Sequence, residues 1–131
     1  MEIPSGTSRE DAKARKQIIK AFYAKWIVAN PKKRVWNKAL GDYIHIKYTS
    51  INETAGQASI SFESTHEVLR LSEILARAIK VKTMPPKKDD KNQKPFTKIL
   101  VMRQKTATLI VGLQRSTGEY VQYCISSRHK K

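Results

Sequence analysis

The chain has 131 residues and a formal net charge of +15, because 26 Lys and Arg stand against 11 Asp and Glu. This length favours one domain whose core is stable without a disulfide or a structural metal. A hydrophobic fraction of 40% excludes a wholly disordered chain. The single cysteine, Cys124, excludes an internal disulfide framework and a cysteine-based zinc cluster. No apolar run approaches the ~20 residues that span a bilayer, and no secretory signal is visible, so we expect a cytoplasmic protein without a membrane partner.

The charge is distributed unevenly along the chain. Residues 1–48 carry 11 basic and 4 acidic side chains, residues 49–83 carry 4 of each, and residues 84–131 carry 11 and 3. If the two basic ends meet in the fold, they create a directed positive field that attracts a polyanion. Nucleic acid is the favoured polyanion, because each neutralised phosphate releases counterions. An anionic membrane or acidic protein, and a surface that serves solubility alone, are the alternatives.

Residues 1–7 predict a flexible arm, and residues 8–29 predict the first helix. Thr7 and Glu10 fit a capping box. Apolar residues at helical spacing follow and predict a stripe that faces the core, formed by Ile18, Ile19, Phe22, Tyr23, Trp26 and Ile27. The helix should end at Asn30, because the residue before a proline is pushed out of the α region.

The next segment predicts a basic turn over residues 31–34 and a half-buried strand over residues 43–48. Trp36, between them, is expected to pack back onto the domain. Alternation along the strand places two sets of side chains on opposite faces. The inward set is Ile44, Ile46 and Tyr48, and the outward set is Tyr43, His45 and Lys47.

Two further capping boxes predict helices in the neutral middle of the chain. Ser50 and Glu53 open a short helical turn that Gly56 closes. Ser64 and Glu67 open a second helix over residues 64–77, which places His66 in its first turn.

The last part of the chain predicts strands joined by polar segments. Residues 79–82 alternate as a strand, and residues 84–95 are polar and charged and predict a mobile basic loop. Residues 96–103, 108–114 and 119–126 predict a three-stranded meander, in which Val121, Tyr123 and Ile125 share one face. Residues 127–131 predict a basic tail.

These elements predict one α+β domain over residues 8–126. Its N-terminal helix and second helix pack on a mostly antiparallel sheet of four to five strands that ends in the meander.

No motif in the chain identifies a reaction. The phosphate-loop, dinucleotide, zinc-protease and hydrolase signatures are all missing from the sequence. Asp89 and Asp90 are the only adjacent carboxylates, and they lie in the predicted loop, whereas a two-metal nuclease holds its carboxylates on a rigid scaffold. We therefore expect no metal site and no cofactor, and Cys124 predicts a small buried side chain.

Four residues are candidates for contact with a phosphate or for acid–base chemistry. His45 and Lys47 share the outward strand face and lie roughly 6–7 Å apart along it, so that one phosphate fits between them. His66 is placed to bind phosphate at a helix N-terminus. Arg115 lies at the tip of a hairpin, where side chains often contact phosphates. An ordinary solvated strand face, a capped surface turn and a plain hairpin turn are the competing interpretations.

Several segments resemble a known group of nucleases in their apolar pattern. They are residues 67–75, 78–81, 108–112 and 118–123. This pattern, over about residues 42–126, is similar to domains of phage and conjugative-element polyvalent proteins in the barnase–EndoU–colicin–RelE-like nuclease superfamily. The resemblance implies an α+β domain with helices on an antiparallel sheet, and either metal-free RNA cleavage or binding alone. It transfers no fixed catalytic set to this chain.

The sequence thus predicts a basic nucleic-acid-binding protein, encoded by a mobile genetic element, that contacts the phosphate backbone. The expected phosphate contacts are Lys16, Lys20, Lys32, Lys33, Arg34, Lys47 and Arg115. Two alternatives stay open. One is a metal-independent ribonuclease that uses His45, Lys47, His66 or Arg115, and the other is an adaptor that docks an acidic protein.

Overall fold

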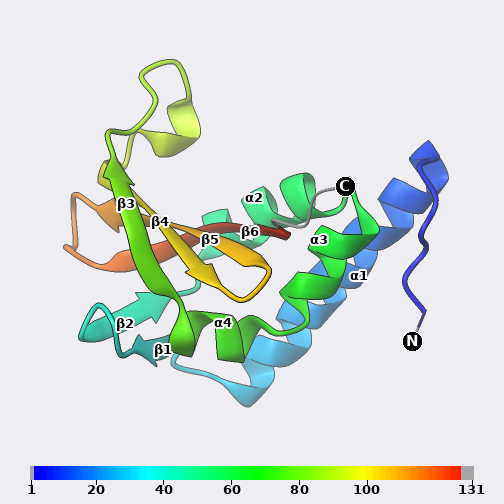
Figure 1. Cartoon of the computed structure of the whole chain (residues 1–131), viewed down its shortest axis with the longest axis horizontal. Coiled ribbons are helices and arrows are strands. Elements are labelled where there is room, and N and C mark those ends of the chain that lie inside the picture. Colours follow the sequence, from blue (N-terminus) through cyan, green and yellow to red (C-terminus); the bar gives the residue numbers. More distant parts are fainter. Residues whose placement is uncertain (1, 128–131) are drawn as a thin grey trace.

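The computed structural model describes residues 2–127 and has an α+β fold (Figure 1). In chain order its elements are α1 (Arg9–Ala29), β1 (Arg34–Asn37), β2 (Asp42–His45), α2 (Tyr48–Ala58), α3 (Phe62–Val68), α4 (Leu71–Arg77), β3 (Ile79–Met84), the 3₁₀ helix η1 (Lys91–Gln93), β4 (Phe96–Gln104), β5 (Ala107–Gln114) and β6 (Tyr120–Ser127). The predicted fold class is confirmed, and so is the C-terminal meander. Of the predicted tail at residues 127–131, Ser127 is the last residue of β6, and residues 128–131 lie outside the described residues.

The sheet has six strands in the order β1-β2-β6-β5-β4-β3, so the expected four to five strands were too few. All neighbours are antiparallel except β2 and β6, which run parallel and pair Ile44 with Tyr120 and His45 with Val121. The additional strand is β1, which begins at Arg34 inside the predicted turn. With four residues, β1 is too short to show a period, and its pairing with β2 defines it.

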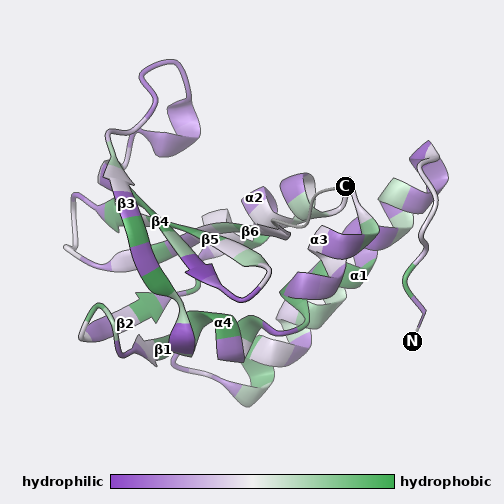
Figure 2. Cartoon of the chain, in the orientation of Figure 1, coloured by the Kyte–Doolittle hydropathy of each residue, from purple (hydrophilic) through white to green (hydrophobic). Residues whose placement is uncertain are grey.

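α1 forms as the sequence predicts and covers one face of the sheet. Ser8, one residue after the expected cap, accepts a hydrogen bond from the Asp11 amide at 3.0 Å. The apolar stripe buries Ile19, Tyr23 and Trp26, so its assignment to the core is confirmed. Figure 2 shows hydrophobic residues recurring between hydrophilic ones along α1.

The middle helices begin at other residues than the capping boxes indicate. α2 starts at Tyr48, and the Ser50 hydroxyl accepts a hydrogen bond from the Lys47 amide at 2.9 Å, so Ser50 caps from within the helix. α2 also continues through Gly56 to Ala58. Because the chain turns into α2 there, Tyr48 is 78% exposed and does not join the inward face of the strand.

The predicted helix over residues 64–77 is two helices with a break at residues 69–70. Ser61, not Ser64, caps α3 by accepting a hydrogen bond from the Ser64 amide at 3.0 Å. His66 therefore lies in the last turn of α3, and the expectation of a place in a first turn was wrong.

Two apolar clusters lie on opposite faces of the sheet. The larger one joins α1, α2, α3 and α4 to the sheet, and the smaller one contains Phe96, Ile99, Val121, Tyr123 and Cys124. The burial predicted for Cys124 is confirmed. The prediction that Val121, Tyr123 and Ile125 share a face was wrong, because a bulge in β6 turns Ile125 into the larger cluster.

A buried polar chain links both layers of the fold. The Tyr23 hydroxyl of α1 donates to the Gln122 side-chain carbonyl at 2.7 Å, and the Gln122 amide donates to the Thr54 hydroxyl of α2 at 2.6 Å. All three side chains are fully buried, so each hydrogen bond satisfies a polar group whose burial without a partner would lower the stability of the fold. Burial raises the pKa of Tyr23, so this hydroxyl stays protonated.

Polar contacts tie the outlying segments to the domain. Buried Arg15 donates to the Pro4 and Gly6 carbonyls, each at 2.8 Å, and so holds the N-terminal arm. In the predicted loop, Met84 belongs to β3 and residues 91–93 form η1, whose Gln93 is buried and accepts from the Lys87 amide. No helix of the described residues has the length and apolarity to cross a membrane.

α4 contacts strands at both edges of the sheet. The Asn37 amide, at the end of β1, donates to the Leu75 and Ala78 carbonyls at 2.8 and 2.9 Å. Ala78 directly precedes β3, the strand at the opposite edge. The sheet is therefore curved, and its curvature brings β1 and the start of β3 to one helix.

Candidate nucleic-acid interface

A basic hollow of about 310 Å³ lies where β2 ends and α2 begins. Its walls come from the turn before β1, from residues 45–48 and from the start of β6, and it is lined by Lys32, Lys33, His45, Ile46, Lys47, Tyr48 and Glu119. Four of the expected functional residues, at positions 32, 33, 45 and 47, thus meet around one concave surface. We call this surface the basic hollow.

Backbone geometry fixes the lysines of the turn. The Lys33 amide donates to the Asn30 carbonyl at 2.8 Å, and the Lys33 carbonyl accepts from the Ile46 amide at 2.8 Å. Lys33 has a φ of +55°, in the left-handed region that residues other than glycine rarely adopt. The turn is therefore held against β2 although the conformation of Lys33 costs free energy. As a result, two adjacent lysines line the basic hollow.

The floor of the hollow contains an ion pair that joins its two walls. The Lys47 ammonium lies 2.6 Å from a Glu119 carboxylate oxygen and 2.8 Å from the Gln114 side-chain carbonyl. The hydrogen bond from Lys47 holds the pKa of Glu119 below its usual range. The parallel pairing of β2 with β6 sets Ile44 beside Tyr120 and His45 beside Val121, and so brings the end of β2 close to Glu119, which directly precedes β6.

His45 is the titratable group of the hollow. Its Nε2 atom lies 3.7 Å from a Glu119 oxygen. Burial lowers the pKa of His45 from 6.5, the positive charges of Lys47 and Arg34 act in the same direction, and Glu119 opposes them. The imidazole is therefore mainly neutral near pH 7 and is able to accept a proton.

Arg34 borders the hollow from the outward face of β1. It pairs with His45 in the β1–β2 register, and its guanidinium carbon lies 4.0 Å above the ring centre of Tyr43. This cation–π contact holds the arginine over the strand next to the hollow.

The other predicted contacts lie elsewhere. Lys16 lines a separate hollow between α1 and α2, and Lys20 is exposed on α1. Arg115 follows β5, and its guanidinium donates to the Phe96 carbonyl at 3.3 Å. Among the described residues, the C-terminal end of the chain contributes Glu119 and no cation to the basic hollow, and Arg115 does not line it.

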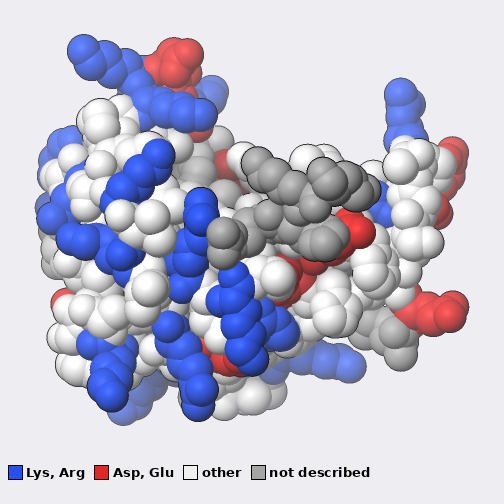
Figure 3. All heavy atoms as spheres, viewed as in Figure 1, with Lys and Arg blue, Asp and Glu red and all other residues white. Residues whose placement is uncertain are grey.

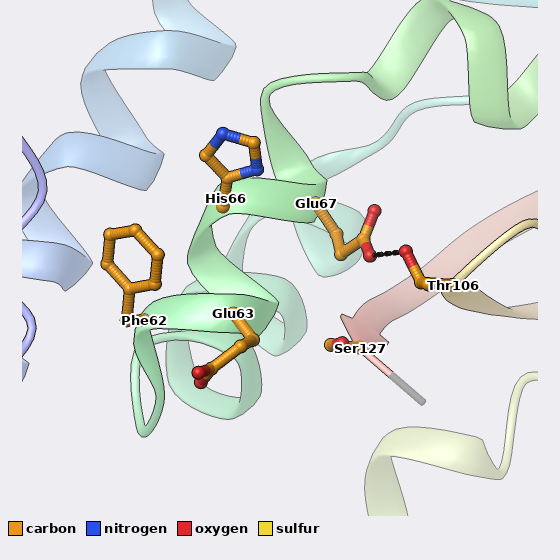
Figure 4. Close-up of a pocket in the computed structure, with 6 residues that line it drawn as sticks. All are labelled: Phe62, Glu63, His66, Glu67, Thr106 and Ser127. Carbon is orange, nitrogen blue, oxygen red and sulfur yellow. Dashed lines mark hydrogen bonds between the residues drawn. The ribbon is translucent and has the colours of Figure 1, made fainter. Parts of the chain in front are cut away.

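His66 lines a third hollow, which has an acidic character. Figure 4 shows its ring beside that of Phe62, with centroids 6.0 Å apart, and Glu67 turned the other way toward the Thr106 hydroxyl, with which it forms a hydrogen bond. Glu63 also lines this hollow. Two carboxylates repel a phosphate, so the surroundings of His66 favour phosphate binding less than the basic hollow does.

A comparison with family models, with curated proteins and with solved structures finds no match to this chain. The site therefore has to be interpreted from its own geometry. Within residues 2–127, no three His, Cys, Asp or Glu side chains gather in a way that could hold a metal ion. Burial raises the pKa of Cys124 to about 12, which leaves this thiol without nucleophilic character near neutral pH.

Three residues in or near the basic hollow were not predicted as site residues from the sequence. Glu119 had no local signal, because only the long-range parallel pairing brings it to Lys47. Tyr48 was assigned to the inward strand face, and Trp36 was expected to pack back onto the domain, yet it is 51% exposed. Trp36 closely follows the basic run at residues 32–34 and Tyr48 follows Lys47, so an aromatic residue just after a basic one is the signal that could have identified them.

Proposed function

We propose that this protein binds nucleic acid and holds its phosphate groups in the basic hollow. The observation that carries the proposal is the convergence of Lys32, Lys33 and Lys47 around a surface whose described lining includes one carboxylate, Glu119. Glu119 is already paired with Lys47, so the two lysines of the turn remain to neutralise phosphates.

The charge of the whole molecule supports this proposal. On the face shown in Figure 3, Lys and Arg side chains predominate over the part that contains β3 and the strands behind it, and acidic side chains lie beside α3, at the start of α1 and on the loop that follows β3. A positive field of this kind steers a polyanion to the sheet side of the molecule. The proposed setting is the cytoplasm of a cell that carries a mobile genetic element, with the nuclease superfamily above as the proposed relative.

Replacing Lys33 with glycine tests the proposal with little risk to the fold. Lys33→Gly removes one charge, and glycine also tolerates the φ of +55° without strain. The matched control is Lys105→Gly, since Lys105 has a φ of +54° and lies in the β4–β5 turn, at the opposite end of β5 from Gln114.

The measurement is fluorescence anisotropy with labelled RNA and DNA over a series of salt concentrations. We expect log affinity to fall linearly with log salt, and Lys33→Gly to reduce the magnitude of that slope by about 0.7–0.9. Lys105→Gly should leave the slope unchanged. Absence of binding by the unmodified protein at low salt would refute the proposal.

Metal-free RNA cleavage is a second candidate, favoured by the contact of His45 with Glu119. A neutral imidazole is suited to take the 2′-hydroxyl proton, and the neighbouring lysines are suited to stabilise the charge of a phosphorane. Labelled RNA incubated with EDTA should then be cleaved by the unmodified protein and by His66→Ala, but not by His45→Ala. RNA that stays intact in a retarded complex leaves binding as the function.

A further inference from the structure

The outward face of the β1–β2 hairpin carries a row of aromatic and cationic side chains. The antiparallel register pairs Trp36 with Tyr43 and Arg34 with His45. The Trp36 and Tyr43 rings meet edge to face with centroids 5.1 Å apart, and Tyr43 and His45 follow at 6.5 Å. The row therefore leads from an exposed tryptophan at one end to the basic hollow at the other.

A second exposed aromatic ring belongs to the lining of the hollow itself. Tyr48, in the first turn of α2, is 78% exposed and lines the same hollow as His45 and the lysines of the turn. The hollow is thus flanked by Trp36, through Tyr43 and His45, and by Tyr48. Large aromatic side chains usually bury most of their surface, and two such rings left open beside clustered cations indicate a ligand that has both flat apolar groups and negative charge.

Nucleic acid with unpaired bases has this combination. Each base of a single strand offers a free π-face for stacking on an aromatic side chain, and a phosphate follows every base. In a duplex the bases stack on one another, so that only phosphates and groove edges are accessible. A surface with stacking platforms therefore discriminates between single and double strands, whereas a surface with lysines alone does not.

We propose that the basic hollow and its two aromatic flanks form a binding site for an unpaired nucleic-acid strand. Bases stack on Trp36 and Tyr48, and the phosphate groups between them lie against Lys32 and Lys33. This inference rests on the proposed function and adds the substrate class to it. RNA and single-stranded DNA share the chemistry, and the experiment compares them.

The test compares paired and unpaired forms of the same sequence. Labelled single-stranded RNA, the corresponding DNA and the two full duplexes are titrated by fluorescence anisotropy with Trp36→Ala, Tyr48→Ala and Tyr48→Phe. Each alanine variant should weaken single-strand binding about 5- to 150-fold, as expected for the loss of one stacked base. Duplex binding should stay within a factor of about two of that of the unmodified protein, because that mode uses the phosphate contacts. Tyr48→Phe should bind like the unmodified protein, since the ring is kept.

Control variants separate failure of this inference from failure of the proposed function. Ile60→Ala removes an apolar side chain that is 72% exposed between α2 and α3 and does not line the hollow, and it should leave every affinity unchanged. Lys33→Gly should weaken single-strand and duplex binding alike. If Trp36→Ala and Tyr48→Ala weaken both forms equally, or neither, the stacking role is refuted while nucleic-acid binding stands. If no oligonucleotide binds, both proposals fail.

Intrinsic fluorescence gives an independent readout of stacking. Trp36 is exposed and Trp26 is 7% exposed, so a stacked base should quench the former. Addition of unlabelled single-stranded RNA should reduce the emission of the unmodified protein, and Trp36→Phe should abolish the change while binding measured by anisotropy persists. A poly-glutamate peptide that binds as tightly as RNA and displaces it would assign the surface to an acidic protein instead and overturn the inference.

Discussion

His45 gives the basic hollow a charge that depends on pH. Burial disfavours the protonated imidazole, so the unfolded chain takes up this proton at a higher pH than the folded protein does. The stability linked to His45 is therefore complete above pH 6.5 and decreases as the pH falls from 6.5 to the lowered folded value. Glu119 acts in a separate window, because its stabilisation is lost only below its ordinary pKa of 4.5.

We accordingly expect the free energy of unfolding to decrease on acidification below pH 6.5. His45→Gln should flatten the decrease above pH 4.5, and His66→Gln should retain it, because His45 is still present. Urea unfolding at a series of pH values measures both. A decrease of equal size in His45→Gln and the unmodified protein would contradict the assignment.

Arg15 shows why a count of charges overstates the positive surface. Arg15 is only 1% exposed and donates to the Ser59 carbonyl at 2.7 Å as well as to the arm. Ser59 is the C-cap of α2, where a positive charge is favourable. Helical spacing places Arg15 next to the apolar stripe of α1. The carbonyls that accept its hydrogen bonds belong to other segments of the chain, and no local pattern in the sequence indicates these contacts.

At the scale of elements, close packing between β4 and β5 requires a glycine. A Cβ atom added at Gly112 would lie 2.5 Å from the Phe96 ring, which is buried in the smaller apolar cluster. Gly56 of α2 is the opposite case, since a Cβ atom added there meets nothing within 4 Å. The two glycines therefore have different reasons to be present.

Substitution of these glycines should change stability in opposite directions. Gly112→Ala overpacks the Phe96 site and should cost about 1–3 kcal/mol. Gly56→Ala restores helix propensity in an exposed turn and should add about 0.5–1 kcal/mol. Chemical denaturation of both variants checks the signs. A neutral Gly112→Ala would mean that the Phe96 ring moves aside freely.

The elements that the sequence predicts well are those with a long period. The stripe of α1 and the alternation of β5 persist over many residues, and both elements form where expected. The errors fall where a single residue decides the structure. The bulge in β6 changes the face of the sheet toward which the following side chains point. The break at residues 69–70 divides one predicted helix into two, and β1 has too few residues to show a periodic pattern.

For the whole molecule, the same charge that attracts nucleic acid opposes the compact state. A net charge of +15 on a chain of this size produces self-repulsion. Salt screens both effects, since the Debye length is about 10 Å at 0.1 M ionic strength. Added salt should therefore weaken the binding of nucleic acid and increase the free energy of unfolding.

We expect the melting temperature to rise with moderate salt while affinity for nucleic acid falls. Relief of about 1 kcal/mol of repulsion corresponds to a rise of about 4 °C for a domain of this length. A variant with Lys16→Gln and Lys20→Gln has less repulsion and should show a smaller rise. Thermal unfolding followed by circular dichroism measures the shift. A melting temperature that decreases with salt would show that ion pairs outweigh repulsion.

The candidate site was predictable only in part, because it is assembled from segments far apart in the chain. Alternation along residues 43–47 predicted that His45 and Lys47 share a face, and both line the basic hollow together with Lys32 and Lys33 of the basic run. The contribution of Glu119 depends on the parallel pairing of β2 with β6, and the exposure of Tyr48 depends on where α2 begins. Both follow from tertiary packing, which overrides local preference.

The pairing of Ile44 with Tyr120 also sets a point in time during synthesis. A ribosome that has translated β1, β2 and α2 has made Lys32, Lys33 and Lys47, but not the strand against which β2 is held. Until Glu119 has left the exit tunnel, the nascent polypeptide lacks the partner of Lys47. The basic hollow is therefore complete only after the start of the last strand of the chain has been synthesised.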